Sequence, residues 1–91
     1  MLVMDVNTWD AKDYREVVKR FSTWPGAPEG DKIVGAWIDV TRRKSFFLHD
    51  VTDVKAAARV AFDWADLITM EEHIVLLPEE TMAIAKEKGW W

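Results

Sequence analysis

The feature that most constrains the fold is the order in which strand-like and helix-like hydrophobic patterns follow one another. Over 91 residues the apolar positions predict strand, helix, strand, strand, helix, strand and helix. The two middle strands, at residues 33–40 and 45–51, are the most apolar and are separated only by a turn at residues 41–44. This order predicts one α+β sandwich, with helices on one face of an antiparallel sheet. The other face then needs a cover that this chain does not supply.

The outer elements have clear local signals. Residues 2–9 alternate at strand period, and the helix after them carries one apolar stripe, formed by Tyr14, Val17, Val18 and Phe21. Thr52 or Asp53 caps a second helix, which we expect to approach the sheet closely through Ala57, Ala58 and Ala61. Residues 68–77 predict a fourth strand. Pro78 then opens a last helix, and Gly89 ends it.

A β-α-β-β-α-β order with right-handed crossovers predicts a ferredoxin-like sandwich with sheet order 4-1-3-2, plus the C-terminal helix, in a single domain spanning residues 1–91. We expect the two main helices to pack on the more apolar strand positions: Leu2, Met4, Val6, Val34, Ala36, Ile38, Phe46 and Leu48. The open face would then carry the alternate positions: Val3, Asp5, Asn7, Ile33, Trp37, Asp39, Phe47, His49, Val51, Glu71, His73 and Val75.

The expected open face predicts self-association. Val3, Trp37, Phe47 and Val75 would form an apolar patch of the size that usually marks a contact surface. A chain of this length has a thin stability margin, and oligomerisation is a common way to bury more area. We therefore expect a homodimer formed through this face.

Composition narrows the function classes. The chain has 16 acidic and 12 basic residues, a formal net charge of −4, and scattered Lys and Arg, which argues against a nucleic-acid partner. It has no Cys, so disulfides and thiolate metal sites are excluded. The N-terminal residues lack a signal-peptide pattern, and no apolar run is long enough to span a membrane. The expectation is a cytoplasmic protein without a membrane partner.

Three short motifs carry a resemblance to a known family. They are Gly35-Ala36-Trp37-Ile38-Asp39-Val40, Phe46-Phe47-Leu48 and Trp64-Ala65-Asp66-Leu67. With its G-x-W-x-D-V hairpin and W-x-D-L helix end, the chain resembles, over about residues 1–80, a domain-of-unknown-function family of short, uncharacterised bacterial and archaeal proteins. The resemblance implies the dimeric α+β barrel group, in which two ferredoxin-like sheets face each other. Ile38 stands where relatives often have a polar residue, and the Trp90-Trp91 tail lies outside the pattern.

The candidate site consists of the polar and aromatic residues of the expected open face. Asp5, Asn7, Trp37, His49 and His73 would line a ligand pocket, with His49, His73 and Asp5 as the candidates for acid–base catalysis. The structural alternative is two interface histidines that are hydrogen-bonded to Asp, Asn or water. A metal site is less favoured than a ligand pocket or a pair of interface histidines. We expect neither a metal nor a cofactor.

Two further features have a structural and a functional interpretation. Trp37 is typical of an interface anchor, although an indole can also stack on a flat ligand. The cluster Arg42-Arg43-Lys44 fits a solvated hairpin tip, with anion binding as the alternative.

The sequence leaves the function open between classes. We expect a dimeric α+β barrel protein that holds a small organic ligand in a pocket on the open sheet face. One alternative, which the resemblance implies, is a cofactor-independent enzyme of the oxygenase or isomerase type. The other is a pure dimerisation or assembly protein. The ligand, the existence of a reaction and the strand register that would bring Asp5, His49 and His73 together cannot be read from the residues.

Overall fold

The computed structural model describes residues 1–91 and has the predicted order of elements. Its strands are β1 (Leu2–Thr8), β2 (Asp31–Ile38), β3 (Lys44–Val51) and β4 (Thr69–Ile74). Its α-helices are α1 (Tyr14–Thr23), α2 (Val54–Trp64) and α3 (Pro78–Glu87), and a single 3₁₀ turn at Ala11–Asp13 precedes α1. The helix after Pro78 and the stop at Gly89, which has a φ of +77°, are confirmed.

The sheet has the order β2-β3-β1-β4, and all neighbouring strands are antiparallel. This is the predicted order 4-1-3-2 read from the opposite edge. It places β1, the first strand of the chain, in the interior between β3 and β4. The predicted ferredoxin-like α+β fold is therefore confirmed.

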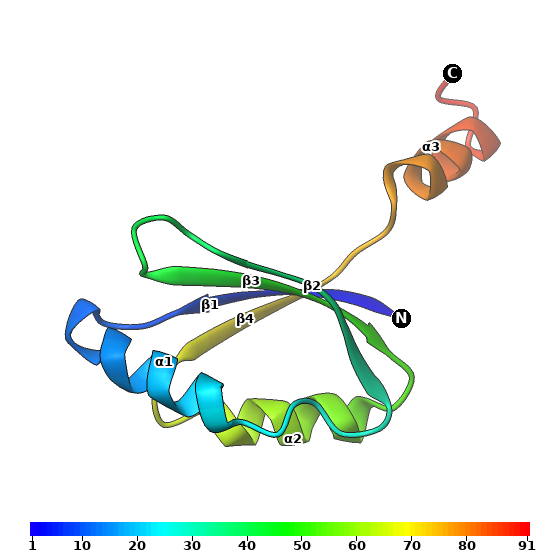
Figure 1. The fold of residues 1–91 in the computed structure, drawn as a ribbon. Coiled ribbons are helices and arrows are strands. Elements are labelled where there is room, and N and C mark those ends of the chain that lie inside the picture. The colour runs from blue at the N-terminus through cyan, green and yellow to red at the C-terminus, as the bar shows by residue number, and fades with distance from the viewer.

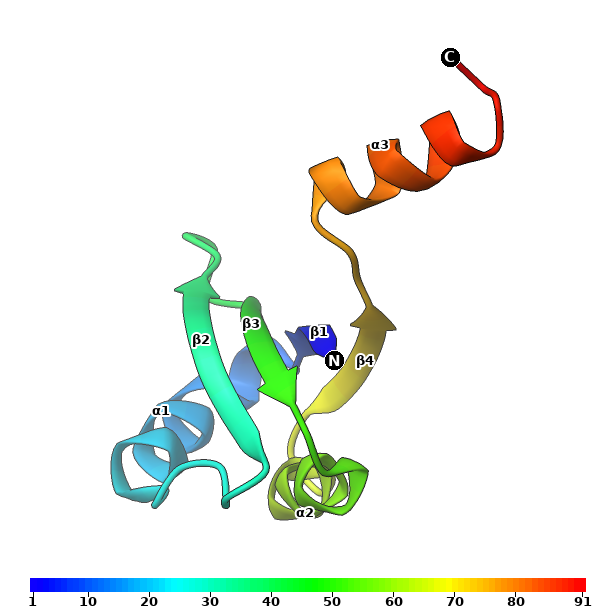
Figure 2. The ribbon, with the colours of Figure 1, turned by 90° about the vertical axis from the view of Figure 1, so that its right-hand side faces the viewer.

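Helices α1 and α2 lie side by side against one face of the sheet (Figures 1 and 2). The guanidinium group of Arg20 on α1 forms a bidentate ion pair with Asp66 just after α2, at 2.6 and 3.0 Å. Trp64, at the end of α2, is buried against Phe21 and Trp24. The W-x-D-L segment therefore joins the two helices at one end of the layer.

Helix α2 is capped by Asp53, whose carboxylate accepts a hydrogen bond of 2.9 Å from the Lys55 amide. Its buried side chains are Ala56, Val60 and Trp64, which recur every four residues along one face. Ala57 and Ala61 are half-buried beside this face, but Ala58 is exposed. The expectation that Ala58 faces the sheet is therefore wrong: the buried stripe is rotated by about one residue, roughly 100°, from the expected one.

The structure also corrects the assignment of sheet faces. Val3, Asp5 and Asn7 are buried beneath the helices, whereas Leu2, Met4 and Val6 lie on the uncovered face. The covered face also carries Phe47, His49 and Val51 of β3 and Ile33 of β2, because their partners across the strands lie on that face. Phe46 and Leu48 therefore lie on the uncovered face. Trp37, Glu71, His73 and Val75 do lie on the open face, as expected.

The physical reason is that most polar positions of the covered face find partners on neighbouring strands. Asp5 and Asp31 contact His49, and the Asn7 Nδ2 amide contacts Ser45, and these contacts offset much of the cost of burying the groups. In addition, β2 has a bulge between Ile33 and Gly35. The extra residue reverses the alternation along the strand, and so Ile33 and Trp37 point to opposite faces.

Helix α3 stands apart from the body, on the side of the sheet opposite to α1 and α2 (Figure 1). The backbone hydrogen bonds of residues 77–91 stay within that segment. The radius of gyration is 15.5 Å, against roughly 12 Å for a compact chain of this length. Met82, Ile84, Trp90 and Trp91 on this arm are exposed. None of the helices is long and apolar enough to cross a lipid bilayer.

Candidate functional site

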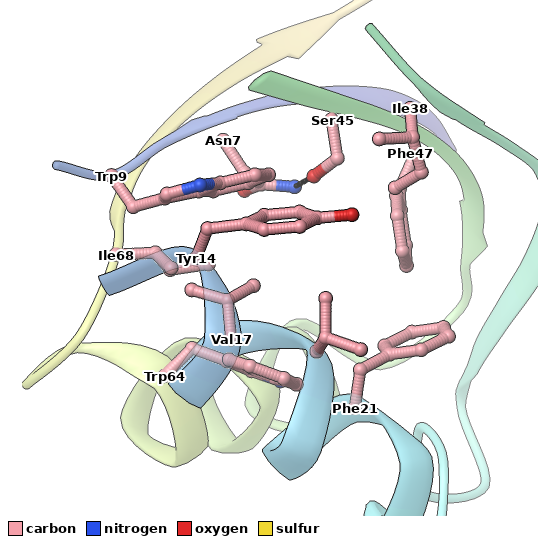
Figure 3. A pocket seen from close by; sticks show the side chains of 11 residues that line it. Asn7, Trp9, Tyr14, Val17, Phe21, Ile38, Ser45, Phe47, Trp64 and Ile68 are labelled. Carbon is pink, nitrogen blue, oxygen red and sulfur yellow. Dashed lines mark hydrogen bonds between the residues drawn. The ribbon is translucent and has the colours of Figure 1, made fainter. Parts of the chain in front are cut away.

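A cavity of about 260 Å³ lies between α1 and the sheet. Tyr14, Val17, Val18 and Phe21 of α1 form one wall, the stripe that the sequence identified as helical. The remaining lining comes from the sheet, from α2 and from the segments next to them: Asn7, Trp9, Ile38, Ser45, Phe47, Trp64 and Ile68. In Figure 3, side chains from the strands and from α1 point toward one another across this space.

Two neighbouring polar side chains lie on the sheet side of this apolar cavity. Asn7 and Ser45 occupy paired positions on β1 and β3 and are 4% and 6% exposed. The Asn7 Nδ2 amide donates a 3.2 Å hydrogen bond to the Ser45 hydroxyl oxygen (Figure 3). The Asn7 Oδ1 atom is buried and has no hydrogen-bond partner. A buried amide oxygen without a partner costs free energy, which a ligand that donates a hydrogen bond would recover.

A line of buried charge lies next to the cavity, beneath α2. His49 Nε2 is 2.6 Å from Asp5 Oδ2, and His49 Nδ1 is 2.6 Å from Asp31 Oδ1. Burial acts to lower the pKa of His49, but the hydrogen bonds and charges of Asp5 and Asp31 outweigh it and raise that pKa to about 9. The imidazole is therefore protonated at neutral pH and forms an ion triplet with the two carboxylates.

The triplet has little room for a ligand. The space between it and α2 is about 10 Å³, which is close to the minimum for a single water molecule. Glu72 borders this space from β4, and loss of hydration, together with repulsion from Asp5, raises the pKa of its carboxyl group. No group of three or more His, Asp or Glu side chains is arranged to hold a metal ion.

The five residues expected to share one pocket are divided between the two faces of the sheet. Asp5, Asn7 and His49 are on the helix-covered face, and Asp5 does contact His49. Trp37 and His73 are on the other face. His49 pairs with Val3 and His73 pairs with Met4, and successive strand residues point in opposite directions. A single pocket holding both histidines, on the open face, is therefore excluded by the register.

The cavity itself depends on residues that the sequence did not assign to a site. Trp9, Tyr14 and Phe47 supply aromatic surface there, and Ser45 supplies the partner of Asn7. The available signal was the α1 stripe, whose spacing identifies the face that packs inward. That signal is the same for a filled core and for a cavity wall, so the stripe alone does not distinguish the two.

Comparison with models of known protein families gives a match that covers most of the chain. The model of a family described as "Domain of unknown function (DUF3303)" matches residues 1–89. Neither the curated proteins nor the solved structures contain a match to this chain.

Proposed function

Because this chain belongs to the family described as a domain of unknown function (DUF3303), whose description assigns no activity, we propose its function from the cavity: the domain binds a small, largely apolar organic molecule between α1 and the sheet. The observation that carries the proposal is the unpartnered Asn7 Oδ1 atom in an otherwise apolar space. Apolar pockets with a few placed polar groups are the usual form of small-molecule sites.

Asn7 and Ser45 determine which hydrogen-bonding groups the ligand must carry. Asn7 Oδ1 accepts a hydrogen bond, and Ser45, whose oxygen already accepts from Asn7, retains a hydroxyl proton to donate. A ligand tip with one donor and one acceptor, such as a carboxamide or a hydroxyl group, satisfies both. The rest of the ligand contacts aromatic rings, which favours a flat, ring-sized body.

Binding is better supported than catalysis. Both ring nitrogens of His49 are engaged by carboxylates at 2.6 Å, and its high pKa keeps it protonated, so it is poorly suited to accept a proton from a substrate. The adjoining space of about 10 Å³ is too small for an organic substrate. The cofactor-independent enzyme that the sequence left open has no comparable feature to support it.

The test is calorimetric titration with 2-naphthamide, a neutral bicyclic amide. We expect saturable binding to the wild type and its loss in Val17→Phe, because the larger side chain fills the cavity from α1. Val54→Phe is the matched control: Val54 is 68% exposed on α2, outside this cavity, and should leave binding unchanged. Melting midpoints of both variants check that they fold. Equal binding to Val17→Phe and the wild type would place the probe elsewhere and refute the proposal.

A second candidate function is homodimeric assembly through the open sheet face. The observation that favours it is the uncovered apolar surface formed by Leu2, Met4, Val6, Phe46, Leu48 and Trp37, together with the unpacked helix α3 on the same side. The two functions are compatible because the ligand cavity is on the opposite face of the sheet.

A further inference from the structure

A second hollow, with the opposite chemistry, adjoins the apolar cavity. It has a volume of about 310 Å³ and lies between the start of α1 and the β2–β3 hairpin. Its lining contains four cationic side chains: Lys12, Arg15, Arg42 and Arg43. In a chain with a net charge of −4, this is a local concentration of positive charge. None of the four takes part in the ion pairs of the structure.

Tyr14 is the wall that the two hollows share. Its ring faces the Arg42 guanidinium group, whose carbon lies 5.5 Å from the ring centroid. A second contact joins the hairpin to the cavity wall. The Trp9 indole, which lines the apolar cavity, donates a 2.9 Å hydrogen bond to the Arg42 carbonyl oxygen. The hairpin is thereby held against the cavity, with its cations next to the aromatic wall.

The backbone of Arg42 is unusual. Its φ is +66°, the left-handed region that residues with a side chain seldom adopt, at a cost of about 1–2 kcal/mol. Glycine would fill this turn position without strain. The chain instead has an arginine there, held by the Trp9 hydrogen bond and packed on Tyr14. A purely structural turn does not need this side chain.

We propose that the ligand is an organic anion, with its apolar ring body in the cavity and its acid group directed to the cations beside Tyr14. This inference rests on the proposed function and specifies the ligand class of the same site. Guanidinium and ammonium groups bind carboxylate and phosphate oxygens through charge-assisted hydrogen bonds, which are stronger than neutral ones. A small anion alone would lack the apolar contacts, and a neutral aromatic would lack the ionic ones.

The test compares two probes of the same shape, 6-hydroxy-2-naphthoate and neutral 6-hydroxy-2-naphthamide, by calorimetry at low salt; both carry a hydroxyl group for the Asn7–Ser45 pair, and they differ only in the charge at the other end. In the wild type we expect the naphthoate to bind roughly tenfold more tightly, with an advantage that shrinks as salt screens the charges. Arg42→Gly should remove most of the advantage while keeping the fold, because glycine suits the +66° backbone. Arg15→Gln should reduce it independently from the α1 side. Arg59→Ala, which removes an exposed charge from α2, should leave it intact.

The outcomes separate the two proposals. Equal affinity for both probes in the wild type would overturn the anion inference and leave the apolar site standing. No binding of either probe would refute the site itself. Titration of inorganic phosphate distinguishes a free-anion site: if phosphate binds as tightly as the naphthoate, and Val17→Phe does not weaken binding of the naphthoate, then the cationic hollow acts alone and the inference is wrong.

Discussion

At the scale of single residues, the main feature of this fold is a protonated imidazole buried between two carboxylates. Asp5, Asp31 and His49 are 2%, 5% and 3% exposed. Removing such charges from water costs several kcal/mol per ion, and the arrangement is stable only because each charge has a close partner. Loss of His49 leaves both carboxylates without a cationic partner. His49→Gln would leave two carboxylates facing each other across a neutral amide, at a cost of roughly 3–5 kcal/mol in unfolding free energy.

The first prediction concerns the titration of the two histidines. In Asp5→Asn, the pKa of His49 should fall by more than about 0.5 unit, because one of the charges that favour imidazolium is removed. His73 is on the opposite face and should not respond. Two-dimensional NMR of both imidazoles over a pH series gives the two values directly. A shift in His73 instead of His49 would contradict the strand register.

A second prediction follows from the direction of the His49 shift. Its pKa is raised from an ordinary 6.5 to about 9, so the folded state binds a proton more tightly than the unfolded state. The associated stability is complete below about pH 6.5, declines between 6.5 and 9 by at most about 1.4 kcal/mol per pH unit, and is absent above. Urea unfolding at pH 6, 7.5 and 9 measures this.

The matched control for that pH series is His73→Gln. His73 is an exposed side chain, 3.6 Å from Glu71, so this variant should keep the wild-type decline. A wild-type free energy of unfolding that stays constant from pH 6.5 to 9 would show that His49 is not held as the imidazolium.

At the scale of elements, the order of strands and helices was predictable because its signals are local. Alternation defined β1, the apolar stripe defined α1, and Pro78 and Gly89 marked the ends of α3. The side of the sheet that the helices cover was not predictable in this way. Counting apolar residues on β1 correctly identifies Leu2, Met4 and Val6 as the more apolar side, but the chain covers the other side.

The polar side of β1 can be buried because its partners come from distant segments. Asp31 lies 18 residues before His49, and Asn7 lies 38 residues before Ser45. Neither pairing has a local signature. The β2 bulge beside Gly35 adds a change of alternation; a glycine within a strand is compatible with a bulge but does not specify one. The sequence thus identified Asp5, Asn7 and His49 as unusual, but not the cavity, whose walls meet only after these long-range contacts form.

The corrected face of α2 gives a prediction with an internal control. Ala56 is fully buried at 0% exposure, whereas Ala58 is exposed on the same helix. Ala56→Leu should overpack the contact with the sheet and destabilise the domain by about 1–3 kcal/mol. Ala58→Leu involves the same chemical change and a similar helix propensity, and should leave stability nearly unchanged. Thermal unfolding of both variants is the measurement, and equal effects would contradict this helix orientation.

At the scale of the whole molecule, one face of the sheet and one helix have no partner within the chain. Ten residues of helix are too few to be stable in water without tertiary contacts, yet α3 extends away from its own body. It does so on the open-face side of the sheet, away from α1 and α2 (Figure 2). An identical copy, related by a two-fold axis, offers the same apolar face and the same arm, so one interface would cover both.

The last prediction is therefore the oligomeric state. Light scattering at micromolar concentration should give twice the chain mass of 10.6 kDa. Leu48→Glu puts a charge at the centre of the open face and should produce a monomer, since an unpaired charge in an apolar interface is costly. Phe62→Glu is the control: Phe62 is 84% exposed on α2, on the covered side of the sheet, and the variant should stay dimeric. A monomeric wild type, or dissociation by Phe62→Glu with Leu48→Glu still dimeric, would rule out this face as the interface.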